Sequence, residues 1–294
     1  MTWNRTIALS ATLGFLLGGV ASGEEKPVRP PVFLNHFYVV LDGPTYKAVE
    51  QSPFLRQQFA PTEKRTTVRT DRSYTGFYFY GTNTYFEFFD GSDPGSAAFA
   101  GDGLAFGVDQ AGGLRALGDE IFIGPQPITR LYEGKQVPWF YMAGFKDLPE
   151  SSGLDIWLME YHPDFLVDWN PRPGSRGVTR KEILHRYAAV LRDVPAKPLL
   201  EDVTALTIAV DEPLRQKLAG ILEALGYSAR QDGGATILKG PDAELRLIPQ
   251  TATARGIQEI TLRVRERPKE MNELRFGTKS VLKFHDNGLA TWSF

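Results

Sequence analysis

The sequence predicts an α+β protein built from tandem modules, each consisting of a strand, a helix and three further strands, paired into two domains. Segments that alternate with a period of two follow segments of helical period in a fixed order, and this order recurs along the chain. A chain of 294 residues is long for one compact domain and natural for two. Because one such module cannot bury a sheet face alone, we expect the modules to pair.

The first two modules occupy the N-terminal half of the chain. In the first, over residues 32–90, the strand VFLNHFYVVLD precedes a helical segment interrupted near Pro53, and three strands follow: KRTTVRT, YTGFYFYG and NTYFEFFD. In the second, GLAFGVD is a strand and QAGGLRALGDEI a short helix, and the last strands are ITRLYEG, PWFYMAGF and LDIWLMEYH. A loop at 170–177 and an amphipathic helix in TRKEILHRYAAVLRDV come next.

The C-terminal modules repeat this order more compactly. VTALTIAV predicts a strand, EPLRQKLAGILEALG an amphipathic helix, and GATILKG and AELRLIP two strands. GIQEITLRVR begins the fourth module, PKEMNELRF is expected to be its helix, and SVLKFHDNGLATWSF predicts a hairpin that turns at residues 286–288.

These patterns divide the chain into a signal peptide (1–23), an N-terminal domain (24–175), a linker helix (176–199) and a smaller C-terminal domain (200–294). The N-terminal residues MTWNR carry a positive charge, TIALSATLGFLLGGV is apolar, and the following ASG provides the small residues that a signal peptidase requires. A membrane anchor fits less well because the apolar run is short and glycine-rich. We therefore expect a periplasmic or secreted protein without a membrane attachment after cleavage.

The composition excludes several classes of function. The formal net charge is −2, and no basic run interleaved with aromatic residues is present, so we expect no nucleic-acid partner. The absence of cysteine excludes disulfides, thiolate metal sites and cysteine nucleophiles. The expected partner is a small-molecule ligand, and a homodimer stays open.

Four modules in two pairs resemble the vicinal oxygen chelate superfamily, which includes glyoxalase I, extradiol dioxygenases and bleomycin-resistance proteins. The resemblance covers the order and spacing of elements over residues 32–294, and it is most specific in the first module, from LNHFYVVLD to TYFEFFD. The chain is also similar to a family of uncharacterised bacterial proteins with a glyoxalase-like fold. The resemblance implies two cup-shaped mixed sheets, with metal ligands on the first and last strands of each module.

Glu87, in the strand TYFEFFDG, is a carboxylate among residues that favour burial, and burial of a charge requires a partner. The first strand carries His36. Alignment of TYFEFFD with IWLMEYHP places Glu160 at the position equivalent to Glu87. His162 follows two positions on and should point to the same face as Glu160. With the resemblance, these four residues are the candidate ligands of a divalent metal such as Zn²⁺, Ni²⁺, Fe²⁺ or Mn²⁺.

One ligand that the superfamily places on the first strand of the second module is missing, because Gly103 or Leu104 occupies that position. Either His162 substitutes for it, or the site has three ligands, or metal binding has been lost. Without a metal, His36 is a hydrogen-bonded core residue, and Glu87 pairs with Arg65 or Arg69.

Aromatic residues on the strands of the first two modules should line the cup and contact a ligand. The candidate substrate-binding residues are Tyr38, Tyr80, Tyr85, Tyr141 and Trp157. The C-terminal domain has no matching pair of His and Glu, and we expect it to be structural or to mediate dimerisation.

Two functions follow from these expectations. The first is a metal-dependent lyase or isomerase acting on a small oxygen-bearing or aromatic molecule, in which Glu87 and Glu160 are catalytic and a displaced glutamate serves as base. The second is a protein of the same fold that binds a small molecule without catalysis.

Overall fold

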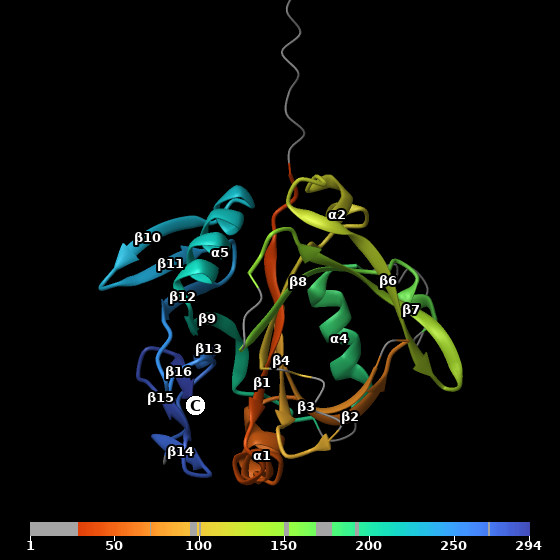
Figure 1. Ribbon diagram of the computed structural model, residues 1–294. Helices are drawn as coiled ribbons and strands as arrows, with labels where there is room; N and C mark the ends of the chain where they lie inside the picture. The colour runs from red at the N-terminus through yellow and green to blue at the C-terminus, as the bar shows by residue number, and fades with distance from the viewer. Residues whose placement is uncertain are drawn as a thin grey trace, which may run out of the picture.

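The computed structural model describes residues 29–70, 72–94, 99, 101–149, 153–168, 178–191, 194–269 and 271–294. It contains two eight-stranded mixed sheets, and each sheet is formed by one pair of modules (Figure 1). The prediction of an α+β fold with two cup-shaped mixed sheets is confirmed. The expected signal peptide lies outside the described residues. No helix in the described part of the chain is long and apolar enough to cross a membrane.

The first sheet has the strand order β2-β3-β4-β1-β5-β8-β7-β6, and its two modules meet where β1 pairs with β5 in antiparallel fashion. The first module consists of β1 (Phe33–Leu41), α1 (Gly43–Glu50), a π-helical turn (Leu55–Phe59), β2 (Thr62–Val68), β3 (Ser73–Tyr80) and β4 (Tyr85–Asp90). The second consists of β5 (Asp102–Gly107), α2 (Gly113–Ala116), β6 (Phe122–Tyr132), β7 (Lys135–Phe145) and β8 (Leu154–Tyr161). In each module the first and last strands are parallel.

The first sheet curls until its two edge strands approach each other. Just after β2, the Thr70 N–H donates to the Thr129 carbonyl of β6 at 3.3 Å. The backbones of Arg69 and Arg130 form an isolated antiparallel β-bridge. Elsewhere along β6, Pro125 and Pro127 lack the N–H that edge pairing requires. The concave side is therefore a deep cup, closed along part of its seam.

The second sheet has the same strand order by position, β10-β11-β12-β9-β13-β16-β15-β14. Its first module consists of β9 (Leu200–Val210), α5 (Glu212–Ala224), β10 (Ser228–Asp232), β11 (Ala235–Lys239) and β12 (Glu244–Pro249). Its second consists of β13 (Gly256–Val264), β14 (Glu273–Phe276), β15 (Ser280–Phe284) and β16 (Leu289–Ser293). The expected hairpin is present, with Gly288 at φ 74° in its turn.

The prediction of a helix in PKEMNELRF is wrong, because part of this segment forms the strand β14. Phe276 is buried and lies 5.5 Å from the ring of Trp292, and strand pairing with β15 overrides the helical tendency of the segment. The change reverses the directions of β14, β15 and β16 relative to the first strand of their module. In the other modules a crossover helix makes the first and last strands parallel, whereas β13 and β16 are antiparallel.

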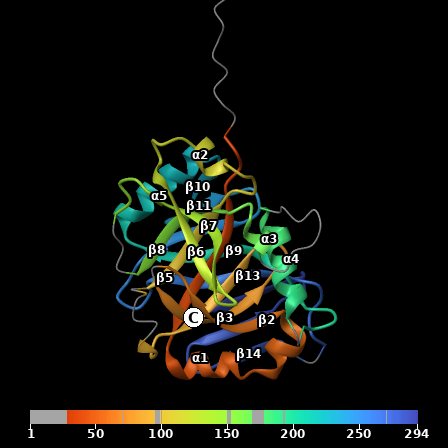
Figure 2. The ribbon, with the colours of Figure 1, turned by 90° about the vertical axis from the view of Figure 1, so that its right-hand side faces the viewer.

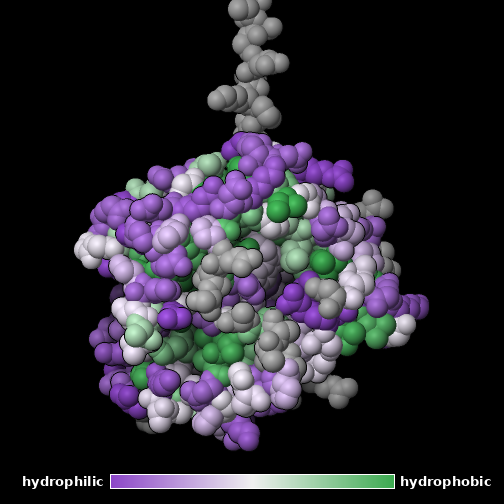
Figure 3. Space-filling view, viewed as in Figure 1, coloured by the Kyte–Doolittle hydropathy of each residue, from purple (hydrophilic) through white to green (hydrophobic). Residues whose placement is uncertain are grey.

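The two sheets pack together through the faces turned away from their cups (Figures 1 and 2). Trp292 of β16 is fully buried, and its ring lies 5.0 Å from Phe88 and 5.4 Å from Phe79 of the first sheet. Asp102 accepts the Ile257 N–H at 2.7 Å, and Asp202 accepts the Thr84 N–H at 3.0 Å, so each sheet contributes a carboxylate that binds the other. The face seen in Figure 3 is largely hydrophilic, with small hydrophobic patches.

A helix fills part of the first cup. After α3 (Phe165–Asp168), helix α4 (Arg180–Val190) lies inside the curl of the first sheet (Figure 1). Thr179 and Glu182 form a capping box at its start. Ile183, Leu184 and Tyr187 pack into the cluster that contains the tyrosines of β3, β4 and β8. The expected linker helix therefore forms part of the core of the N-terminal domain.

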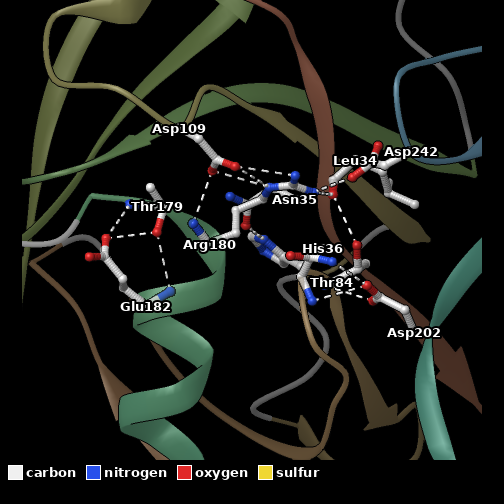
Figure 4. Close-up of polar contacts among 11 residues, drawn as sticks. Leu34, Asn35, His36, Thr84, Asp109, Thr179, Arg180, Glu182, Asp202 and Asp242 are labelled. Carbon is white, nitrogen blue, oxygen red and sulfur yellow. Dashed lines mark hydrogen bonds and ion pairs between the residues drawn. The ribbon is translucent and has the colours of Figure 1, made fainter.

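Arg180 fixes the start of α4 to both halves of the molecule (Figure 4). Its guanidinium group donates to Asp109, to the Leu34 carbonyl at 2.7 Å and to Asp242 of the second domain at 2.6 Å. The side chain is buried, so these partners offset the desolvation of its charge.

Candidate functional site

Strand alternation decides which residues face the first cup. On β1, His36 and Tyr38 point to the concave side, whereas Phe37 joins the core between the sheets. On β4, Glu87 points into the cup, and its neighbours Phe86 and Phe88 point to the core. His36 and Glu87 thus share one face, as the sequence predicts.

A cavity of about 330 Å³ occupies the cup. Its described lining comes from five strands, from Arg69 and Arg72 beside the β2–β3 turn, and from Phe99. The strand residues that line it are His36, Tyr38, Tyr74, Tyr85, Glu87, Phe89, Trp139, Phe140, Met142, Gly144, Asp155, Ile156 and Trp157. A volume of this size suits a small organic molecule.

His36 is held as a neutral imidazole. Its Nδ1 lies 2.9 Å from Asn35 Oδ1, and because that oxygen can only accept, Nδ1 carries the proton (Figure 4). Burial, and then the positive charge of Arg69, lower the pKa of His36 to about 3. The unprotonated Nε2 lies 4.0 Å from Glu87 Oε1, beyond direct hydrogen-bonding distance.

Glu87 is only 4% exposed, and its Oε2 has no hydrogen-bond partner. Burial raises the pKa of Glu87 to about 7, although Arg65, a hydrogen bond from Tyr78 and Arg69 act in the opposite direction. Arg65 forms its ion pair with Glu63, at 3.0 Å, and stacks on Tyr78. The alternative of an ion pair between Glu87 and Arg65 is therefore wrong.

Glu160 does not join this site. It lies on the other face of β8 from Met159 and Tyr161, which face the cup, and it accepts the backbone N–H groups of Gly112 at 2.6 Å and Leu114 at 2.9 Å. The expected convergence of Glu160 with Glu87 is wrong, because a shift of one residue in the alignment of β4 with β8 reverses the face. Glu160 instead caps the start of α2.

His162 and Tyr141 lie on the same side as Glu160, away from the cavity. His162 follows β8, accepts the Asp164 N–H at 3.1 Å and packs on the Tyr141 ring at 5.2 Å. Tyr141 lines a separate pocket with Glu160 and Arg115. The expected proximity of His162 to His36 and Glu87 is wrong as well.

The other expected ligand-binding residues divide between the cavity and α4. Tyr38, Tyr85 and Trp157 line the cavity. Tyr80 lies under α4, where its ring stacks on Tyr187 at 5.5 Å and its hydroxyl donates to Glu63 at 2.8 Å. Three of the five predicted aromatic residues therefore reach the site.

The residues of the cup do not fit the metal centre that the resemblance implies. His36 and Glu87 supply two ligands, and no group of three His, Cys, Asp or Glu side chains is close enough for one cation among the described residues. At Gly103, a Cβ atom would lie 2.0 Å from Cε1 of Tyr38. The ring of Tyr38 thus fills the space where the missing ligand would project.

Several residues that complete the cavity were not predicted from the sequence. Asp155 accepts a hydrogen bond from the Tyr38 hydroxyl at 2.9 Å, and its position two residues before Trp157 on β8 could have placed it on the same face. Arg69, interpreted only as an ion-pair partner, and Arg72 bring positive charge to the cavity. Phe99 follows β4 in a loop, and no periodicity marks it.

Fold and site together define a tandem β-α-β-β-β protein with an aromatic cavity in its first cup. The chain belongs to a family of unknown function, DUF5829, whose model matches residues 34–294. No curated protein matches the sequence.

Two solved structures show a distant likeness. A hypothetical protein from Staphylococcus aureus has 9% identity and a TM-score of 0.48, over 77% of this chain and 88% of that chain. A proposed dioxygenase from Bacillus subtilis has 14% identity and a TM-score of 0.26, over 81% of this chain and 72% of that chain. Both are too distant to carry an argument about activity.

Proposed function

We propose that the first cup binds a small, flat molecule, and that binding is the function of this domain. The observation that carries the proposal is the gathering of buried polar atoms without partners around one aromatic cavity. Glu87 Oε2, Trp157 Nε1 and Trp139 Nε1 are three such atoms, and all three residues line it. Because buried polar groups in proteins are nearly always hydrogen-bonded, a ligand with matching groups explains them.

The described lining of the cavity contains both positive and negative side chains. Arg69 and Arg72 are the positive side chains, and Asp155, which accepts a hydrogen bond from Tyr38, is a negative one. Glu87 is half protonated near neutral pH, because burial raises its pKa to about 7. A ligand in this cavity therefore meets charged side chains of both signs among the described residues.

A ligand screen with a blocked cavity tests this function. Native mass spectrometry of the protein with a panel of flat, oxygen-bearing molecules should identify ligands retained at one per chain. Met142→Trp adds bulk inside the cavity and should abolish retention, whereas Ile123→Trp, at a side chain that is 63% exposed on β6, should not. Retention that survives Met142→Trp in the folded protein would place the ligand elsewhere and contradict the proposal.

A second candidate function is catalysis of proton transfer, as in a lyase or isomerase. It is favoured by Glu87, a buried acid with a pKa near 7 beside a neutral histidine in a cavity. If Glu87 exchanges protons with a bound molecule, then carbon-bound hydrogens of retained ligands should exchange with D₂O, and any ligand that Glu87→Gln still retains should not exchange. Retained ligands that never exchange would leave binding as the function.

Relationship and location form part of the same proposal. The order of the modules and the parallel pairing of their first and last strands support membership of the vicinal oxygen chelate superfamily. The N-terminal sequence supports export to the periplasm or medium. N-terminal sequencing of the protein from its native host should find a chain that begins near Glu24, and an intact Met1 in the cytoplasm would contradict export.

A further inference from the structure

We infer that the cavity holds the polar end of its ligand by direct hydrogen bonds to the protein, without a bridging divalent cation, and that this end carries a donor beside an acceptor. The inference rests on the proposed binding function and specifies its chemistry. It departs from the metal-mediated binding that the resemblance implies.

Three neighbouring side chains of the cavity offer complementary hydrogen-bonding atoms. His36 Nε2 has a free lone pair and, with the unpartnered Glu87 Oε2, offers positions for a ligand donor. Trp157 Nε1 is buried, has no partner and can only donate, so it requires a ligand acceptor. The Trp157 ring lies 5.4 Å from that of His36, and His36 Nε2 lies 4.0 Å from Glu87 Oε1, so the three side chains adjoin one another in the cavity wall.

The cup has no space for a third metal ligand on β5. Gly103 and Ala105 are the residues of β5 that pair with Tyr38 and His36, and neither has a donor atom in its side chain. The Tyr38 ring covers Gly103, and the hydrogen bond to Asp155 holds its hydroxyl. Among the described residues, a cation between His36 and Glu87 would therefore have only two protein ligands, fewer than the three that catalytic sites retain.

The walls of the cavity are formed by flat aromatic rings. His36 stacks on Tyr85 with ring centroids 4.4 Å apart, and Trp157 stands nearly perpendicular to His36, at 71°. Tyr38 lies against Phe89 and Phe99 at 5.0 and 4.9 Å. Flat aromatic faces pack best against a flat ring, so the donor and acceptor belong to a planar molecule.

A pair of matched probes tests the inference. 2-Pyridone is a flat ring with an N–H donor beside a carbonyl acceptor, and N-methyl-2-pyridone lacks the donor. In an NMR titration of the full chain, 2-pyridone should shift the indole N–H signal of Trp157 and bind at least tenfold more tightly than the methylated probe. Trp157→Phe should weaken 2-pyridone binding by about tenfold, and EDTA or added Zn²⁺ or Ni²⁺ should leave the affinity unchanged.

The outcomes separate this inference from the proposed function. Equal binding of both probes, or binding that needs added metal or is lost in EDTA, would overturn the inference while leaving a ligand in the cavity. If other flat molecules are retained but 2-pyridone is not, the donor–acceptor requirement is wrong. If neither the probes nor any molecule of the panel binds, the proposed function fails as well.

Engineering the missing ligand gives an independent test with a metal readout. Tyr38→Ala combined with Gly103→His opens the space beside β5 and adds a third donor, so the folded double variant should bind one equivalent of Zn²⁺ by elemental analysis. Wild type and Tyr38→Ala alone should bind none at this site. One equivalent of Zn²⁺ in wild type that disappears in His36→Ala would overturn the inference, as would a folded double variant without zinc.

Discussion

The burial of Glu87 makes the stability of the protein depend on pH in a way that one substitution should remove. Burial raises the pKa of Glu87 from its usual 4.5 to about 7. In the unfolded chain the carboxyl group releases its proton near the lower value, whereas in the folded protein it keeps the proton up to the higher one. The folded state therefore binds more protons between these values, and its stability falls as the pH rises through them.

At about 1.4 kcal/mol for each pH unit, this interval corresponds to about 3 kcal/mol of unfolding free energy. Glu87→Gln keeps the shape of the side chain and removes its charge, so the variant should lack this loss. Near pH 4 the two proteins should unfold at similar urea concentrations, because Glu87 is largely protonated in both states. Above pH 7 the variant should be the more stable by about 3 kcal/mol.

Urea unfolding across this pH range, followed by tryptophan fluorescence, measures the effect. Burial also raises the pKa of Asp102 to about 7, so wild type alone would report both carboxyl groups. The difference between wild type and Glu87→Gln cancels the contribution of Asp102. Parallel pH profiles, or a variant that is less stable at every pH, would refute the assignment of Glu87 as a buried acid without an ionic partner.

Three further substitutions test the packing around the site. Gly103→Ala forces the Tyr38 ring out of its place and should lower the unfolding free energy by about 1–3 kcal/mol in urea. Gly144→Ala, whose Cβ meets nothing within 4 Å, is its control, and equal effects of the two would contradict the packing argument. Arg180→Met leaves two carboxylates unpaired and should lower the melting temperature, with a loss of about 2–3 kcal/mol after allowance for their partial exposure. Glu160→Gln should lower the unfolding free energy by about 1 kcal/mol without changing ligand binding. Impaired ligand binding would show that Glu160 belongs to the binding site.

Residue positions within one strand could be predicted from the sequence more reliably than the alignment of one strand with another. Within one strand, the period of two places His36, Tyr38 and Glu87 correctly, whereas Tyr141, on a strand whose pairing with β6 contains register shifts, lies outside the cavity. Between strands β4 and β8 the prediction depended on a repeat alignment, and a shift of one residue sent Glu160 to the opposite face.

Two other features needed information that local patterns do not contain. The amphipathic pattern of α4 indicated a buried face but not its partner, and only the curl of the first sheet shows that Tyr187 packs on Tyr80. The segment at β14 has helix-forming residues, yet burial of Phe276 against Trp292 decides its conformation.

A crystal structure of the protein with the tightest ligand of the screen tests the central claim most directly. Our account predicts electron density in the first cup, with ligand atoms within hydrogen-bonding distance of Glu87 Oε2 and Trp157 Nε1, and a planar ring against Tyr85 and Tyr38. Density for the ligand between the two sheets, under α4 or against the second sheet, with the first cup filled by water alone, would contradict it.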